Sequence, residues 1–201
     1  MSLPAKCAIL LLSIAAAVAA DKKDPRFAPG PASSYPNRET TGGLTLAALA
    51  METAEQARPA FGKLNPYEHG LLPVLLILQN DSGQALNLEQ LRVEYNPPDG
   101  RRIEATPAKD VPYLHGPDRP STGPRTNPLP RRKKKNPLEA FEIEGRAFAV
   151  RMLPRGEAAH GFFYFQTKHR SGAKLYVTGI REAGSGKELF YIEINLDTPA
   201  R

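Results

Sequence analysis

Short apolar segments separated by turn residues recur from Leu44 to Leu196, and no long window shows the 3.6-residue periodicity of an amphipathic helix. The run at residues 71–81 is almost wholly apolar and closes on Asn-Asp-Ser-Gly. It is shorter than most helices and is bounded by turn residues, so we expect a strand buried on both faces. A chain divided in this way favours an antiparallel all-β fold.

Other segments alternate between apolar and polar residues, as strands with one buried face do. In residues 91–96, Leu91, Val93 and Tyr95 face one way and Arg92 and Glu94 the other. The Pro-Pro-Asp-Gly that follows predicts a turn, and residues 101–105 predict the second arm of a hairpin. Further strands are predicted at residues 44–51, 141–153, 158–167, 174–180 and 187–196, and one or two helical turns at 52–62, ended by Pro59 and Gly62.

These strands predict an immunoglobulin-like antiparallel β-sandwich of about 7–9 strands, with a closed barrel as the competing all-β architecture. The strand at residues 73–80 is followed by Leu-Pro-Arg-Gly-Glu at 153–157, which leads into Gly-Phe-Phe-Tyr-Phe at 161–165. This pattern resembles exported bacterial immunoglobulin-like domains, in which an Asn-Ser turn closes an early strand and a Pro-Gly-Glu turn precedes a late aromatic one. Arg155 is an insertion relative to that turn. The resemblance covers residues 44–197 in outline and implies a fold but no catalytic residue.

The first 20 residues have the layout of a cleaved secretory signal peptide. Lys6 precedes an apolar run at residues 8–20 that only Ser13 interrupts and that ends in small residues. The run is shorter than the roughly 20 residues needed to span a bilayer core. A buried helix or an uncleaved anchor is the alternative. Cys7 would leave with the signal peptide, so disulfides, thiol catalysis and cysteine-ligated metals are excluded from the mature chain. We therefore expect an exported protein, periplasmic or secreted, soluble after cleavage and without a transmembrane span.

The rest of the chain divides into a leader and one domain. Residues 21–43 are rich in proline, glycine, serine and charge, which predicts a flexible leader. The β-sandwich domain is expected at residues 44–197, and it contains a proline-rich basic loop at about 107–138. Such a loop, with many prolines and adjacent cations, is expected to project into solvent.

The basic character of the chain is confined to that loop. The chain has a formal net charge of +6, from 27 basic and 21 acidic residues. Residues 116–138 hold seven of the basic residues and one acidic residue, Asp118, so the mature chain outside this segment carries about −1. Nucleic-acid binding is disfavoured, because no aromatic residues are interleaved with the charges and export separates the protein from most nucleic acid.

The candidate partner-binding residues are five consecutive cations, Arg131, Arg132, Lys133, Lys134 and Lys135. They are expected to contact an anionic envelope surface or an acidic protein, at about 1 kcal/mol per cation near an anionic membrane. Salt weakens such contacts. The alternative is a solvated insertion whose lysines aid solubility.

The sequence predicts no catalytic, cofactor-binding or metal-binding residues. Its four histidines, His69, His115, His160 and His169, form no metal-binding pair, and His160 is interpreted as a packed or surface residue. Glu142 and Glu144 share a predicted exposed strand face, and residues 184–187 lack the spacing of a phosphate loop and predict a hairpin turn.

The leading hypothesis is therefore a non-enzymatic, exported binding or assembly module of the bacterial cell envelope, which uses strand edges and the basic loop. The alternative is an exported hydrolase or carbohydrate-active accessory domain, with a groove that contains Tyr113, His115 and nearby carboxylates. A purely structural envelope subunit is the third hypothesis.

Overall fold

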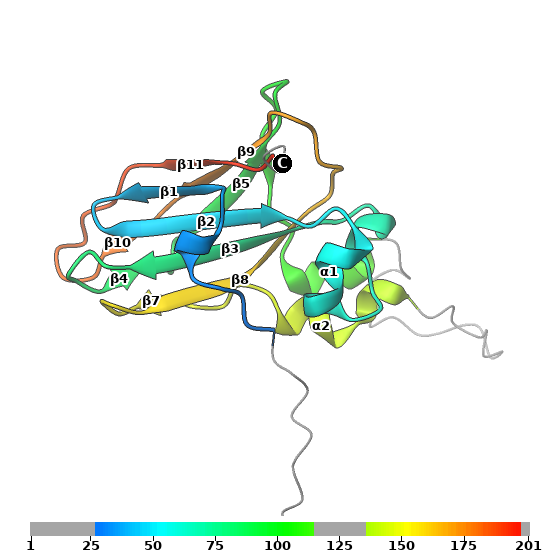
Figure 1. Cartoon of the computed structure of the whole chain (residues 1–201), viewed down its shortest axis with the longest axis horizontal. Helices are drawn as coiled ribbons and strands as arrows, with labels where there is room; N and C mark the ends of the chain where they lie inside the picture. The colour runs from blue at the N-terminus through cyan, green and yellow to red at the C-terminus, as the bar shows by residue number, and fades with distance from the viewer. Residues whose placement is uncertain (1–26, 115–135, 198–201) are drawn as a thin grey trace, which may run out of the picture.

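The computed structural model of the chain describes residues 27–114 and 136–197 (Figure 1). The expected signal peptide and the candidate residues Arg131–Lys135 lie outside these ranges. The described strands are β1 (Arg38–Thr41), β2 (Leu44–Ala50), β3 (Leu72–Asn80), β4 (Leu86–Asn87), β5 (Arg92–Asn96), β6 (Ile103–Glu104), β7 (Met152–Leu153), β8 (Ala158–Phe165), β9 (Lys174–Thr178), β10 (Arg181–Glu182) and β11 (Ile192–Asn195). The described helices are α1 (Ala54–Phe61), α2 (Phe141–Gly145) and the 3-10 turns η1 (Ala32–Ser34), η2 (Pro66–His69), η3 (Ala108–Tyr113) and η4 (Pro137–Glu139).

The described strands form three antiparallel sheets, which confirms the all-β class. In the first sheet the strand order is β1-β2-β3-β8, and in the second sheet it is β11-β9-β5-β6. A third, smaller sheet has the order β10-β4-β7. None of the described helices is long and apolar enough to cross a membrane.

The main core lies between the first and second sheets, and β3 agrees with the strand predicted at residues 71–81. Its residues Leu72, Val74, Leu76 and Leu78 belong to the main core. Leu75 and Ile77 point to the other face, into a second apolar cluster. The strand is therefore buried on both faces, as an almost continuous apolar run requires.

The second cluster is covered by short helices at one end of the first sheet, where α1 and α2 lie together (Figure 1). Phe61 of α1 packs on Phe162 of β8 with 4.8 Å between ring centroids. Helix α1 begins at a capping box, in which the Thr53 hydroxyl accepts a hydrogen bond from the Gln56 amide at 3.2 Å. Pro59 lies inside α1, and Gly62, at φ 64°, ends it.

The prediction of a strand at residues 141–153 is wrong for most of that segment. Residues 141–145 form α2, and only Met152 and Leu153 form a strand. Ile143 is buried, whereas Phe141 is 84% exposed. Apolar residues at every second position match one helical turn as well as a short strand, so five residues do not distinguish the two. Glu142 and Glu144 accordingly lie on a helix and not on a strand face.

The described part of the expected flexible leader is folded against the first sheet. Strand β1 pairs with β2 along its whole length, from Arg38 opposite Ala47 to Thr41 opposite Leu44. Ala32 of η1 is buried in the second cluster. At the other end of the chain, the strand predicted at residues 187–196 is shorter than expected and covers only residues 192–195.

Candidate functional site

The structure tests little of the site that the sequence predicted. The five basic residues Arg131–Lys135 and His115 lie outside the described ranges. Tyr113 ends η3, which packs against α2, so Tyr113 and Glu142 belong to neighbouring elements. His160 is exposed on β8 and contacts the Phe27 ring, with 6.3 Å between centroids.

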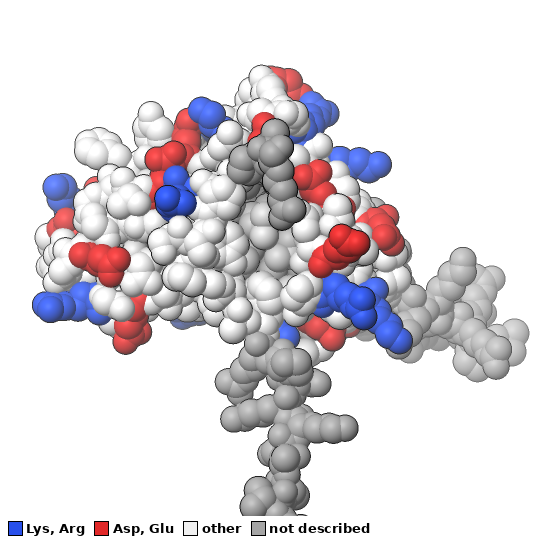
Figure 2. All heavy atoms as spheres, in the orientation of Figure 1, with Lys and Arg blue, Asp and Glu red and all other residues white. Residues whose placement is uncertain are grey.

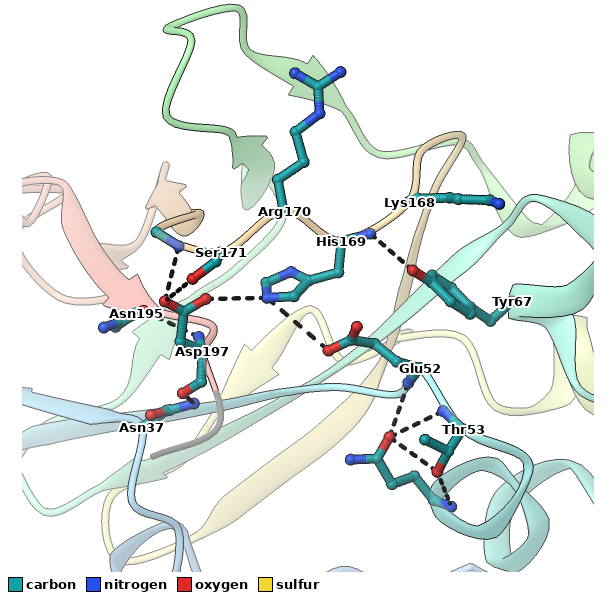
Figure 3. A network of polar contacts seen from close by, with 12 residues as sticks. Asn37, Glu52, Thr53, Tyr67, Lys168, His169, Arg170, Ser171, Asn195 and Asp197 are labelled. Atoms are coloured by element: carbon teal, nitrogen blue, oxygen red, sulfur yellow. Dashed lines mark hydrogen bonds and ion pairs between the residues drawn. The ribbon is translucent and has the colours of Figure 1, made fainter. Parts of the chain in front are cut away.

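A polar network surrounds His169, in the loop between β8 and β9 (Figure 3). The His169 side chain is only 8% exposed, and its Nε2 lies 3.1 Å from Asp197 Oδ1 and 4.0 Å from Glu52 Oε1. Its Nδ1 lies 3.4 Å from the Tyr95 hydroxyl, and its backbone N–H donates to the Tyr67 hydroxyl at 3.2 Å. Residues from four separate parts of the sequence therefore meet at His169, three of them at its imidazole.

Asp197 is the acceptor that holds this network together. Its Oδ2 accepts hydrogen bonds from the Gly172 amide at 2.8 Å and from the Ser171 hydroxyl at 3.2 Å. The Gly172 amide contributes most to lowering the pKa of the Asp197 carboxyl, and the His169 and Ser171 hydrogen bonds lower it further. The Asp197 backbone carbonyl accepts from the Asn37 amide at 2.8 Å.

The hydrogen bonds of this network join the loop between β8 and β9 to Asp197, just after β11. Both nitrogens of His169 face groups of the protein, and the Ser171 hydroxyl points to Asp197 and not to the imidazole. Within the described ranges no three acidic, histidine or cysteine side chains are grouped to hold a metal ion.

The outer face of the second sheet carries a stack of three flat side chains, Arg102, Tyr176 and Tyr191. Together with the exposed Phe190, which precedes Tyr191 in the chain, we call these residues the aromatic face. Tyr176 of β9 stacks on Tyr191 with 5.1 Å between centroids and 28° between planes. The Arg102 guanidinium lies 4.0 Å above the Tyr176 ring and 3.3 Å from Glu94. Phe190 is 90% exposed and Tyr191 is 58% exposed.

Carboxylates flank this stack in one cross-strand row. Glu94 is the partner of both Glu104 and Tyr176, and Glu193 lies opposite Tyr176 on its other side. Arg102 pairs with Glu94, and Lys174 pairs with Glu193 at 3.1 Å. The face thus combines exposed rings with charges that are mostly paired with one another.

A groove of about 470 Å³ opens beside this face, between β5 and β8. Strand β6 pairs with β5 only at Glu94 and Tyr95, and the chain then crosses to the first sheet, where Thr106 donates to the Tyr164 carbonyl at 2.7 Å. This divergence leaves a wedge-shaped space along β5. Its floor includes the stacked rings of Phe148 and Phe163, 5.5 Å apart.

The described residues carry no excess of positive charge. They include 15 lysines and arginines against 18 aspartates and glutamates. Figure 2 shows both signs interspersed around the periphery of one face, with uncharged residues over its centre. The observed charge distribution agrees with a basic character that belongs to the segment outside the described ranges.

Sequence reasoning missed the aromatic face. A strand over all of residues 187–196 would place Phe190 on the same side as the buried Ile192 and Ile194, but the chain just before Ile192 is not in a strand and Phe190 is exposed. Two adjacent aromatic residues before a strand were the available signal, since an alternating strand can bury only one of them. Comparison with known proteins finds no matching family model, curated protein or solved structure.

Proposed function

We propose that the protein is an exported, non-enzymatic binding or assembly module of the bacterial envelope with an immunoglobulin-like sandwich. The strand order supports the fold assignment. Strands β2, β3 and β8 are adjacent in the first sheet, and β11, β9 and β5 in the second. These neighbours correspond to strands A, B and E and strands G, F and C of the immunoglobulin arrangement.

The aromatic face carries the proposal of a binding role. Exposed apolar surface rimmed by polar groups marks interaction sites, and tyrosine, phenylalanine and arginine are enriched in protein interfaces. Phe190 and Tyr191 are exposed side by side in a chain that contains only eight phenylalanines and seven tyrosines. A protein partner would bury these rings and shield them from water.

Co-purification from native envelope fractions tests this role. We expect a Phe190→Ser, Tyr191→Ser double variant to lose partners that the wild-type chain retains. Phe141→Ser is the matched control, because Phe141 is 84% exposed but lies on α2 at the helical end of the molecule. Equal recovery of partners by the wild-type chain and the double variant would contradict the proposal.

The basic segment supplies a second contact within the same proposal. Its five cations are expected to attract an anionic membrane surface, and the effect should decrease with salt. Replacing Arg131, Arg132, Lys133, Lys134 and Lys135 by glutamine should leave folding intact and weaken adsorption to anionic vesicles, with neutral vesicles as the control. Unchanged adsorption at low salt would exclude an electrostatic contact.

Export itself is tested by N-terminal sequencing of the mature protein, which should begin at Ala20 or Asp21.

A carbohydrate-active accessory domain is the second candidate function, and the aromatic face favours it as well. The exposed Tyr191 ring offers an apolar plane to a sugar, and Glu193 nearby offers acceptors for hydroxyl groups. Retention on insoluble peptidoglycan or glucan distinguishes this function from protein binding. Glycan retention that is lost in the Phe190→Ser, Tyr191→Ser variant and is insensitive to salt would favour it.

A further inference from the structure

Strand β5 has a free edge along the groove, at Arg92 and Val93. Glu94 and Tyr95 pair with β6, whereas Arg92 and Val93 pair with β9 alone within the described residues. Proteins usually shorten, charge or cover such an edge, because its unpaired amide and carbonyl groups accept another strand. Here the edge borders a groove of about 470 Å³, which lies in the range of about 300–1,000 Å³ that ligand sites occupy.

The floor of the groove is apolar on the side that faces the core. Val93 points into the main core, and the partly buried rings of Phe148 and Phe163 stack beside it. In a strand added alongside β5, the residue opposite Val93 would point to the same side as Val93. An apolar side chain at that position would cover the two rings.

The outer side of the same edge carries an unpaired cation. Arg92 is exposed, lies opposite Thr178, and makes none of the ion pairs found among the described residues. Its neighbour Glu94 is already neutralised by Arg102 at 3.3 Å. Opposite charges in directly opposed cross-strand positions stabilise a sheet, and like charges destabilise it. The position opposite Arg92 therefore favours an acidic side chain.

From these observations we infer that β5 binds an extended segment of a partner protein as an added strand in which apolar and acidic residues alternate. The apolar residues would fill the groove over Phe148 and Phe163, and an acidic residue would pair with Arg92. Main-chain hydrogen bonds along the edge would supply affinity, and the two side-chain positions would supply specificity. This inference rests on the proposed binding function but uses a surface separate from the aromatic rings.

Synthetic hexapeptides test the inference with the full chain. The probe alternates valine with glutamate, and matched peptides carry lysine for glutamate or serine for valine. Fluorescence anisotropy should show the strongest binding for the valine–glutamate peptide. Arg92→Glu should weaken binding of the valine–glutamate peptide about fivefold and strengthen binding of the valine–lysine peptide by a similar factor. Because Arg92 is exposed, this variant leaves the core intact.

Hydrogen exchange locates the bound peptide. Of the amides of Arg92 and Val93, the one that faces the free edge should exchange more slowly when the valine–glutamate peptide is bound, because it gains an acceptor. The Phe190→Ser, Tyr191→Ser variant should bind the peptide as the wild-type chain does, so that failure of the proposed function and failure of this inference are distinguishable. Equal binding of all three peptides, no detectable binding, or unchanged exchange at both residues 92 and 93 would overturn the inference.

Discussion

At the scale of single residues, Asn80 joins the two turns on which the resemblance to immunoglobulin-like domains was based. Its side-chain amide donates to the carbonyls of Gln84, Leu153 and Pro154 at 2.8, 3.1 and 3.0 Å. Its carboxamide oxygen accepts from the Ser82 hydroxyl at 2.6 Å. The residue is fully buried, so water cannot replace these hydrogen bonds.

Replacing Asn80 by aspartate should destabilise the fold by about 3 kcal/mol, because aspartate cannot donate to the three carbonyls and leaves them with a buried negative charge. Urea unfolding measures the loss. Ser82→Ala, which removes one hydroxyl at the edge of the same turn, should cost about 1 kcal/mol. If both variants unfolded at the wild-type urea concentration, Asn80 would not be the residue that joins the turns.

Asp197 gives the His169 network a defined pH dependence. The hydrogen bond from the Gly172 amide is the main reason that its pKa lies below the ordinary value of 3.8. A carboxyl with a lowered folded-state pKa stabilises the protein above its unfolded-state pKa, and this contribution is lost as the pH falls through the folded-state value.

Asp197→Asn should therefore lower the free energy of unfolding at neutral pH and flatten its decrease below about pH 4. Urea unfolding of both proteins across this acidic range measures the two slopes. Glu89→Gln, which changes an exposed carboxylate outside the network, is the control and should follow the wild-type slope. Parallel curves for Asp197→Asn and the wild-type chain would exclude a role for Asp197 in acid unfolding.

At the scale of elements, the sequence predicts strands well where burial imposes a pattern. The continuous apolar run of β3 and the alternation of β5 predicted the right elements, because β3 is buried on both faces and β5 on one. Strand β1, with the sequence Arg-Glu-Thr-Thr, is exposed at every residue and is held by backbone pairing, so it has no apolar signature. Helix α2 has too few residues for its periodicity to be distinguished from that of a strand.

The segment that contains Arg146 and Phe148 covers the outer edge of β8, and Gly161 allows its close approach. The Phe148 amide donates to the Phe162 carbonyl at 3.1 Å, and the Phe162 amide donates to the Arg146 carbonyl at 2.9 Å. A Cβ atom on Gly161 would lie 2.4 Å from Phe148 Cα. Because the atoms that it would meet belong to the Phe148 backbone and not to the end of a flexible side chain, the segment that contains Phe148 would have to move away from β8.

Gly161→Ala should therefore destabilise the protein by about 1–3 kcal/mol, the usual cost of overpacking. It should also speed hydrogen exchange of the Phe148 amide, which loses its acceptor. Gly184→Ala is the control, because a Cβ atom there meets nothing within 4 Å. Wild-type stability and unchanged exchange in Gly161→Ala would show that the segment does not depend on this close contact.

At the scale of the whole molecule, the site was harder to predict than the fold. The His169 network joins residues as distant in sequence as Asn37 and Asp197, and no local pattern indicates that they meet. The groove likewise arises because the chain after Glu104 leaves β5 and crosses to β8, a change of sheet that strand periodicity does not encode. The basic segment, in contrast, is evident from the sequence alone.

The hydrogen bond from the Asn37 side chain to the Asp197 carbonyl joins the two ends of the domain. Strand β1 is polar and covers the edge of β2, whose residues are buried on both faces. A chain that begins at residue 44 lacks β1, η1 and the Asn37–Asp197 hydrogen bond. It would expose an apolar edge strand, which promotes association with other chains.

We expect the chain that begins at residue 44 to be less stable by about 3 kcal/mol or more, at roughly 1 kcal/mol per lost hydrogen bond, and to aggregate. The chain that begins at residue 27 retains every described element and should unfold as the full chain does. Urea unfolding and size-exclusion chromatography compare the two. If both truncated chains behaved alike, residues 27–43 would be the flexible leader that their composition predicts, and the edge of β2 would need no cover.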